Sequence, residues 1–396
     1  MKVAAIRTAT SELLPSSTAS VTSLELPDDL SREVYCILGM PVDAIGMDEV
    51  LRRIQSAAAA RIPFLISTPN LNFLVNSHLD RDFRESLILS DLCTADGVPI
   101  IWIAWLAGIP IKNRVAGADI FDALKAGHGT SHRLKIFLFG GPEGVAPAAS
   151  RALNGRPSGL YCVGWLYPGY GSAEEMSRDD IIDNINASGA DFLSASLGAQ
   201  KGQLWLQRNH HRLLIPVRAH LGASLNFQAG TVRRAPSIMR EIGLEWLWRI
   251  KEEPYLGRRY WNDGRVLLRL LFTHVLPSAF WTWWLRLRYE RGEDLIITQA
   301  HGYETVTLSI SGPANTRHVD KAIRAFREAI ATKKQIALDF SNTRTIDARF
   351  LGLLLMLKKT LKNTGAAPIF KGLSPGLKII FRLNGLDFKP SSDACI

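Results

Sequence analysis

Residues 134–144 read LKIFLFGGPEG, and this stretch decides the fold. Its run of large apolar residues fits a strand that is buried on both faces, and the Gly-Gly-Pro after it fits a tight turn into a helix. Strands of this kind belong to parallel sheets, because helices cover both faces of such a sheet. We therefore expect an α/β domain built around this strand.

Similar apolar strands lie on both sides of it and alternate with helical patterns, which favours a parallel sheet. The expected strands lie within PFLIST (63–68), DLCTADG (91–97), GLYCVGWL (159–166), DFLSASLG (191–198) and LIPVRAHLGASLNFQAG (214–230). In such folds, ligands bind beyond the carboxyl ends of the strands. There, the backbone of Gly140 and Gly141 could approach phosphate groups, although a glycine pair between a strand and a helix is more often only a turn.

Composition limits the class of protein. The chain has 396 residues, of which 47% are hydrophobic and 21% charged, values that exclude general disorder and allow two or three domains. The four cysteines are far apart and form neither a disulfide framework nor a metal-binding spacing, which favours a reducing compartment. No apolar run has the length of a membrane span and no signal peptide is visible, so we expect a cytoplasmic protein.

The chain divides into four expected parts. They are a flexible leader over 1–31, the parallel-sheet domain over 32–230, a basic Trp-rich appendage over 231–293, and a separate small α/β domain over 294–396. The last part contains two alternating strands, a helix, a strand and a second helix within about a hundred residues, which is enough for an independent domain.

The net charge of +10 requires an acidic partner or a local explanation, and much of it lies in the appendage. Arg and Trp occur together in VLLRLLFTHVLPSAFWTWWLRLR (266–288), which is typical of a helix that lies on a membrane surface. Arg269, His274 and Pro277 interrupt the segment too often for a span. The alternative is a buried amphipathic helix with Trp in the core. No nucleic-acid motif is present, so we expect no nucleic-acid partner.

Residues 92–108, LCTADGVPIIWIAWLAG, place the carboxylate of Asp96 against a run of apolar residues. A buried carboxylate is costly unless it is paired or used. Asp96 is therefore a cap, a member of an ion pair, or a working acid or base.

Seven stretches between residues 35 and 260 resemble, in order, the motifs of the WecG/TagA/CpsF glycosyltransferase family. They are STPNLNFLV (67–75), DLCTADGVPIIW (91–102), NRVAGADIFDAL (113–124), IFLFGG (136–141), SLGAQKGQLWL (196–206), LGASLNFQAGTVRRAP (221–236) and GLEWLWRIKEEPYLGRRY (243–260). The resemblance implies a Rossmann-like domain that moves a sugar from a UDP-sugar to a polyprenyl-pyrophosphate-linked acceptor. It further implies inversion, no metal or other cofactor, and a peripheral location on the inner face of the cell membrane. Such enzymes act in exopolysaccharide or other envelope-glycan synthesis, and family members often form homo-oligomers.

The resemblance also implies roles for individual residues. Asp96 stands at the general base of the Ala-Asp-Gly motif, and Thr68 and Asn70 match a Thr-Pro-Asn element that binds substrate. Arg114 matches an arginine suited to clamp a diphosphate, because its planar fork fits phosphate oxygens. We expect Asp119 of the same motif to cap the helix that follows.

Some positions depart from the family pattern. Where many members have Gly-x-Pro-Lys-Gln-Glu, this chain has Lys201 followed by Gly202 and Gln203. We keep Lys201 and Gln203 as candidate substrate contacts, and these departures concern the identity of the donor more than the type of reaction. In the appendage, Arg249, Arg258 and Arg259 match basic positions expected to bind the acceptor pyrophosphate or the membrane, the alternative being a solvated face.

Residues 294–396 resemble STAS domains, mainly through ALDFSNTRTIDARFLGLLL (337–355). Arg349 stands at the usual phosphoacceptor serine, so we expect a scaffold or ligand-sensing module with an unknown protein or ligand partner. Two other functions stay open. One is a non-catalytic regulator that acts through the STAS domain, and the other is a nucleotide-dependent oxidoreductase, for which the complete glycine fingerprint is missing.

Overall fold

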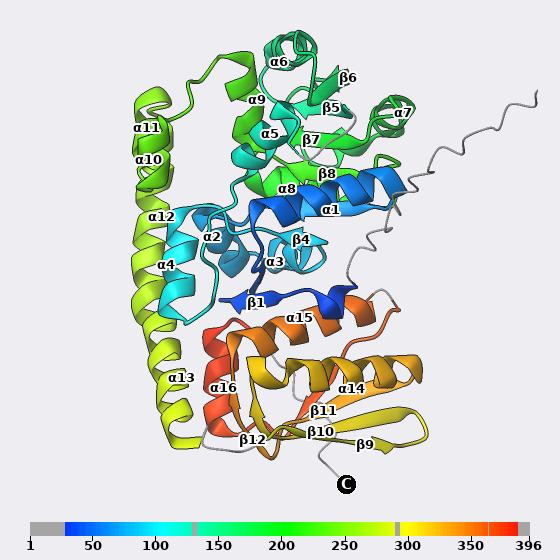
Figure 1. Ribbon diagram of the computed structural model, residues 1–396, viewed down its shortest axis with the longest axis vertical. Coiled ribbons are helices and arrows are strands. Elements are labelled where there is room, and N and C mark those ends of the chain that lie inside the picture. The colour runs from blue at the N-terminus through cyan, green and yellow to red at the C-terminus, as the bar shows by residue number, and fades with distance from the viewer. Residues whose placement is uncertain (1–27, 129–132, 290–293, 363, 387–396) are drawn as a thin grey trace, which may run out of the picture.

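The computed structural model describes residues 28–128, 133–289, 294–362 and 364–386, and shows two α/β domains with a long helical arm along one side (Figure 1). Residues 1–27 of the expected leader lie outside the described residues. Its last residues are part of the folded protein, because Asp28 caps the 3₁₀-helix η1 (Asp29–Ser31) and Leu30 is buried.

The larger domain is built on the expected parallel sheet, with strand order β4-β3-β8-β7-β5-β6 and every pairing parallel. The strands are β3 (Phe64–Ser67), β4 (Leu92–Cys93), β5 (Leu134–Gly140), β6 (Leu160–Leu166), β7 (Phe192–Ser196) and β8 (Val217–His220). Alternate residues of β5 enter opposite cores, since Ile136 and Leu138 lie in one and Phe137 and Phe139 in the other. This burial on both faces explains the continuous apolar runs in the sequence.

Helices cover both faces of this sheet. The core on one face includes α1 (Met47–Ala60), α5 (Gly117–Ala126), α6 (Val145–Asn154) and α9 (Gly222–Ala229). Helices α7 (Asp179–Ala187) and α8 (Ala199–Arg208) line the other face, after the 3₁₀-helix η2 (Glu175–Ser177). Beside α8 lie α2 (Leu71–Leu79) and α3 (Arg81–Ile88).

An antiparallel hairpin that the sequence did not predict, β1 (Val34–Ile37) and β2 (Met40–Asp43), lies between the two domains. Both strands are fully buried. Arg32, just before the hairpin, makes a buried bidentate pair with Asp43 at its end, at 3.1 Å from Nε and 2.8 Å from Nη2.

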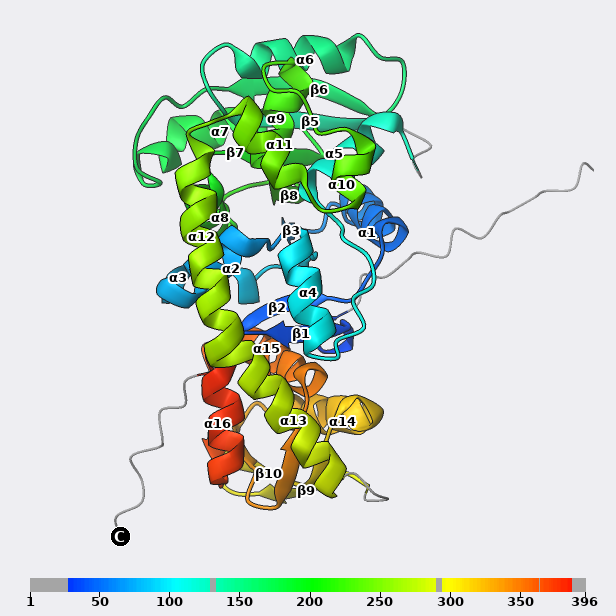
Figure 2. The ribbon, with the colours of Figure 1, turned by 90° about the vertical axis from the view of Figure 1, so that its left-hand side faces the viewer.

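From Ser237 onward, the described part of the appendage is mostly helical. Its elements are α10 (Ser237–Glu241), α11 (Glu245–Glu252), α12 (Leu256–Leu270), the π-helix η3 (Leu271–Val275) and α13 (Leu276–Tyr289). Figure 2 shows α12 and α13 running from the first domain down along the second. Trp281 and Trp284 pack against the C-terminal core, whereas Trp246, Trp261 and Trp283 are exposed. Over the described residues, the length and hydropathy of every helix fall short of what crossing a membrane requires.

The C-terminal domain is a mixed sheet with strand order β12-β10-β11-β13, and β9 pairs antiparallel with β10. Its strands are β9 (Ile296–His301), β10 (Thr305–Ala314), β11 (Gln335–Asp339), β12 (Thr343–Ile346) and β13 (Ile369–Lys371). Its helices are η4 (Thr316–His318), α14 (Val319–Ala331), α15 (Ala348–Lys362) and α16 (Pro375–Leu383). Helix α15 is buried on nearly every side because it packs on the C-terminal sheet and also contacts β1 of the first domain.

Candidate functional site

The carboxyl ends of the central strands bring several polar side chains to one edge of the sheet. Thr68 follows β3, Asp96 follows β4, Ser196 ends β7 and His220 ends β8. These strands are neighbours in the order β4-β3-β8-β7, so their ends form a continuous line.

Asp96 lies partly buried at this edge. Its amide donates to Pro69 O at 2.8 Å, and its Oδ2 accepts from the Gly117 amide at 3.4 Å. It does not cap the next helix, α4 (Val98–Leu106), which begins after Gly97 without a side-chain cap. Burial of the carboxylate raises the pKa of Asp96 to about 7; Arg114 opposes this rise and Glu245 adds to it. A carboxylate that titrates near neutral pH is suited to act as a general base.

Thr68 and Asn70 lie on either side of Pro69, whose carbonyl oxygen accepts from the Asp96 amide. A Cβ on Gly117 would lie 3.2 Å from Thr68 Oγ1, and a Cβ on Gly97 would lie 3.8 Å from Asn70 Cβ. Asn70 also caps α2, because its Oδ1 accepts from the Phe73 amide at 3.2 Å. Gly117 therefore packs closely against Thr68, whereas a Cβ on Gly97 would make only an ordinary contact with Asn70.

Arg114 links the sheet domain to the appendage. Its Nη2 bonds Asp119 Oδ2 at 3.0 Å and its Nη1 bonds Glu245 Oε2 of α11 at 2.8 Å. The prediction that Asp119 caps the next helix was wrong: the N-cap of α5 is Ala116, and Asp119 instead pairs with Arg114, Arg234 and Arg240. Two of these three arginines come from the appendage, so charge attraction holds it against the site.

The three appendage arginines named from the sequence lie in different surroundings. Arg249 is paired with Glu253 at 2.7 Å and lies 6.0 Å from the ring of Phe227. Arg258 and Arg259 are exposed on α12. Arg249 therefore lies beside Phe227 of α9.

Gly140 and Gly141 have positive φ angles of 92° and 79°, as the turn requires. A Cβ on Gly140 would lie 2.7 Å from Ser196 O, and one on Gly141 would lie 2.6 Å from Leu225 Cδ2. The Gly141 amide already donates to Ser196 O at 2.7 Å. The phosphate-binding prediction for this pair does not hold, because the turn packs tightly and uses its amide internally.

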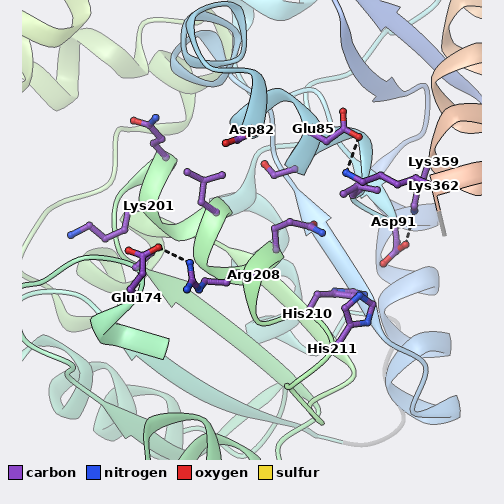
Figure 3. A pocket seen from close by; sticks show the side chains of 16 residues that line it. Asp82, Glu85, Asp91, Glu174, Lys201, Arg208, His210, His211, Lys359 and Lys362 are labelled. Carbon is purple, nitrogen blue, oxygen red and sulfur yellow. Dashed lines mark hydrogen bonds and ion pairs between the residues drawn. The ribbon is translucent and has the colours of Figure 1, made fainter. Parts of the chain in front are cut away.

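Lys201 and Gln203 bond residues other than Asp96. Lys201 donates to Gly171 O at 2.6 Å and lines a cleft of about 1030 Å³ between α3, α8 and α15 (Figure 3), which Asp96, Thr68 and Arg114 do not line. Gln203 is fully buried: it accepts from Ser67 Oγ at 2.9 Å and donates to Ser86 O and Ser90 Oγ. Gln203 therefore supports the strands and is not a substrate contact, contrary to expectation.

His220 is a further candidate site residue, and the sequence did not point to it. Its imidazole stacks over Gly202, where any Cβ would overlap the ring. The side chain is 8% exposed, and its Nε2 has no hydrogen-bond partner. Burial lowers the pKa of His220 to about 4, so the ring is neutral near pH 7. One feature of the sequence could have indicated His220: it stands at the end of an expected strand, directly before Leu221 and Gly222.

The described residues contain no group of three or more His, Cys, Asp and Glu side chains arranged to hold a metal ion. Cys36, Cys93 and Cys162 are buried free thiols, and Cys395 lies outside the described residues.

Known proteins match the two domains of the structure in the same order along the chain. Residues 297–393 match the STAS domain. The N-acetylglucosaminyldiphosphoundecaprenol N-acetyl-beta-D-mannosaminyltransferase of Bacillus subtilis (strain 168) is 25% identical over 221 residues, 56% of this chain and 84% of the relative. The enzyme of the same name from Bacillus spizizenii is 27% identical over 198 residues, 50% of this chain and 74% of the relative. The enzyme of the same name from Staphylococcus aureus (strain NCTC 8325 / PS 47) is 25% identical over 221 residues, 54% of this chain and 82% of the relative.

The match to the whole family is broader than the match to any of these relatives. The sequence model described as "Glycosyl transferase WecG/TagA/CpsF family" covers residues 35–279, which include the hairpin, the parallel sheet, α10 to α12 and the start of α13. The chain therefore belongs to the WecG/TagA/CpsF family of glycosyltransferases, with a STAS domain at its C-terminal end.

Proposed function

We propose that this protein moves a sugar, with inversion, from a UDP-sugar to a polyprenyl-pyrophosphate-linked acceptor in exopolysaccharide or other envelope-glycan synthesis. The observation that carries the proposal is the Asp96 carboxylate, with a pKa near 7, at the ligand-binding edge of a glycosyltransferase sheet. The names of the relatives support the class of acceptor, a sugar on diphosphoundecaprenol.

In this reaction the acceptor hydroxyl oxygen attacks the anomeric carbon as the bond from that carbon to the UDP oxygen breaks. Asp96 takes the hydroxyl proton, and UDP leaves with the bonding electron pair. A base is most effective when its pKa lies near the working pH, which burial achieves for Asp96. Thr68 and Asn70, the neighbours of the residue that bonds the Asp96 amide, would orient the sugar hydroxyls.

Arginines at the junction with the appendage supply the charge for a pyrophosphate. Arg234, Arg240 and Arg249 each have a buried Nε without a hydrogen-bond partner. An unsatisfied buried donor is costly, and a phosphate oxygen would satisfy it with a charge-assisted bond. Arg114, paired with Glu245 of the appendage, lies close enough to affect the pKa of Asp96. We therefore assign the pyrophosphate to this junction.

An apolar face beside the site fits a membrane surface. On α12, η3 and α13, exposed large side chains alternate with arginines along one stripe, comprising Arg258, Trp261, Arg265, Leu268, Arg269, Phe272, Leu276, Phe280 and Trp283. On α4, Trp102 and Trp105 are 59% and 76% exposed. Figure 2 shows α4, α12 and α13 on the same side of the molecule. Trp at the headgroup level together with basic residues is the pattern of an interfacial anchor, so we propose peripheral binding to the inner face of the membrane.

Helix α4 begins directly after Asp96 and Gly97, so binding of its tryptophans to lipid would hold the base close to the headgroups. The pyrophosphate of a polyprenyl carrier lies at that level of the bilayer. The membrane face and the junction arginines therefore point to the same class of acceptor.

The second candidate is a non-catalytic regulator, and the departures from the family pattern at Gly202 and Gln203 are the sequence feature that favours it. The structure weakens that argument, because Gly202 makes space for His220 and Gln203 is part of the strand support. Both departures thus have packing reasons that leave the surroundings of Asp96 intact.

The test offers a panel of UDP-sugars to the protein together with a polyprenyl-pyrophosphate-linked sugar in vesicles. The release of UDP and the anomeric configuration of the product are measured. Formation of a lipid-linked glycan with inverted configuration is expected. Product with retained configuration would contradict the proposed single displacement, and UDP release that does not depend on the lipid acceptor would contradict the proposed acceptor.

A further inference from the structure

Helix α15 of the STAS domain places a lysine in the interior of the protein. Lys359 is 4% exposed, and its Nζ donates to Asp91 Oδ1 at 2.7 Å, Asp29 Oδ1 at 2.8 Å and Ser90 O at 3.2 Å. These contacts use all three N–H groups of the ammonium. A buried ammonium is costly unless it is paired in this way, so Lys359 is tightly bound to its acceptors.

Two acceptors of Lys359 lie in the catalytic domain, and the third, Asp29, lies in η1 just before that domain. Asp91 also connects to the central sheet, because its Oδ2 accepts from the Leu65 amide of β3 at 2.8 Å. Figure 3 shows the Lys359–Asp91 contact at the border between α15 and the catalytic domain. A single residue, Asp91, thus links Lys359 of the STAS domain to the central sheet of the catalytic domain.

Two of these three acceptors, Asp29 and the carbonyl oxygen of Ser90, also bind Arg32. Its Nη1 donates to Asp29 Oδ1 and Ser90 O, both at 3.0 Å, while its Nε and Nη2 bond Asp43. Asp43 Oδ2 in turn accepts from the Cys93 amide of β4 at 2.7 Å. Two buried cations, one from each domain, therefore hold the segment from Ser90 to Cys93.

That segment leads directly to the candidate base. Strand β4 contains only Leu92 and Cys93, too few residues to fix its own position. Beyond it, the Thr94 amide donates to Ser67 O at 3.0 Å and the Asp96 amide to Pro69 O at 2.8 Å. The place of Asp96 therefore depends on what holds the residues just before it.

We propose that Lys359 is a positioning residue for sugar transfer: through it, the STAS domain holds β4 in the register that places Asp96 at the acceptor. This inference rests on the proposed role of Asp96 as the base. It identifies the catalytic domain itself as a partner of this STAS domain, at a contact made by helix α15.

Two neighbouring lysines on α15 are matched controls. Lys358 and Lys362 bond the two carboxylate oxygens of Glu85, at 2.7 Å and 3.0 Å, and their side chains are 44% and 48% exposed. Glu85 lies on α3, so these lysines cross the same border between the domains without contacting β4.

The first test measures kcat and the donor KM of the full chain, with Lys359→Met and Lys359→Arg compared with Lys358→Met. For Lys359→Met we expect kcat to fall on the order of tenfold while the donor KM changes by less than about twofold, since a displaced base slows the chemical step. Lys359→Arg keeps the charge and should recover most of kcat, and Lys358→Met should match the wild type. Wild-type kcat in folded Lys359→Met would overturn the proposal.

Lys359→Met leaves Asp91 facing an apolar side chain, which threatens folding. The double variant Lys359→Met/Asp91→Asn avoids an unpaired charge, and the amide oxygen can still accept from the Leu65 amide. We expect the same loss of kcat in this variant.

A second readout does not depend on activity. Amide hydrogen exchange at Thr94 and Asp96 should be faster in Lys359→Met and in Lys359→Met/Asp91→Asn than in Lys362→Met, because these amides bond β3 and the turn after it. Unchanged exchange at both amides in a folded variant would overturn the proposed coupling. If the wild type transfers no sugar, the proposed function fails while exchange still decides whether Lys359 holds β4.

Discussion

Glu245 Oε2 of the appendage accepts a hydrogen bond from Arg114 Nη1 at 2.8 Å, although 131 residues separate the two in the sequence. Glu245 also raises the pKa of Asp96, whereas Arg114 lowers it. The site at the sheet edge is therefore completed by the appendage, which contributes both to its shape and to the proton affinity of the candidate base.

The first prediction concerns Glu245→Gln. Loss of this negative charge lowers the pKa of Asp96, so the base is ionised at lower pH and the acid limb of kcat/KM moves to lower pH. A pH–rate profile of the variant measures the shift. Glu241→Gln, an exposed residue on α10, is the control and should keep the wild-type limb.

The second prediction concerns stability. A carboxyl whose pKa is higher in the folded than in the unfolded state favours folding at low pH, and this contribution is lost as pH rises through the folded pKa of about 7. Asp96→Asn should therefore raise the free energy of unfolding at pH 8 by about 1–3 kcal/mol, and by less at pH 5. Denaturant unfolding at the two pH values measures this difference. An equal change at both would show that the ionised carboxylate is not destabilising.

The third prediction concerns the packing of His220 on Gly202. Gly202→Ala places a methyl group into the imidazole and should cost about 1–3 kcal/mol of stability. His220→Ala removes the ring, so Gly202→Ala should cost much less in that background. A double-mutant cycle of thermal unfolding measures the coupling, and additive effects would show that the two residues do not constrain each other.

The fourth prediction concerns the membrane face. Replacing Trp102 and Trp105 by Ala should weaken partitioning onto anionic vesicles by about tenfold or more, because both side chains are largely exposed on α4. Trp165→Ala, an exposed tryptophan on β6, is the control. Sedimentation with vesicles measures both. Equal partitioning of the double variant and the wild type would remove α4 from the membrane face.

Much of the fold was visible in the sequence for a physical reason. Strands buried on both faces, such as residues 134–140, are continuous apolar runs. Thr68 directly follows one strand and Asp96 comes three residues after the end of another, so both were expected at the same edge of the sheet. The WecG/TagA/CpsF resemblance then gave these residues their expected roles.

What the sequence missed depends on contacts between distant residues. The β1–β2 hairpin is short and buried against α15, so its pattern shows no alternation. Asp119 lies in the first turn of α5, three residues after the N-cap position, and arginines from the appendage engage it. Gln203 looked like a ligand contact until burial beneath β3 gave it partners. The imidazole of His220 packs on Gly202 because the fold brings β8 and α8 side by side, and the sequence alone does not show this contact.

The most direct test of the central claim is the rate of sugar transfer by Asp96→Asn beside the wild type, with the UDP-sugar that serves the wild type best and a vesicle-borne acceptor. If Asp96 is the base, the folded variant should lose at least about a hundredfold in kcat and no longer show the acid limb near pH 7. A rate close to that of the wild type, with the same dependence on pH, would contradict this assignment.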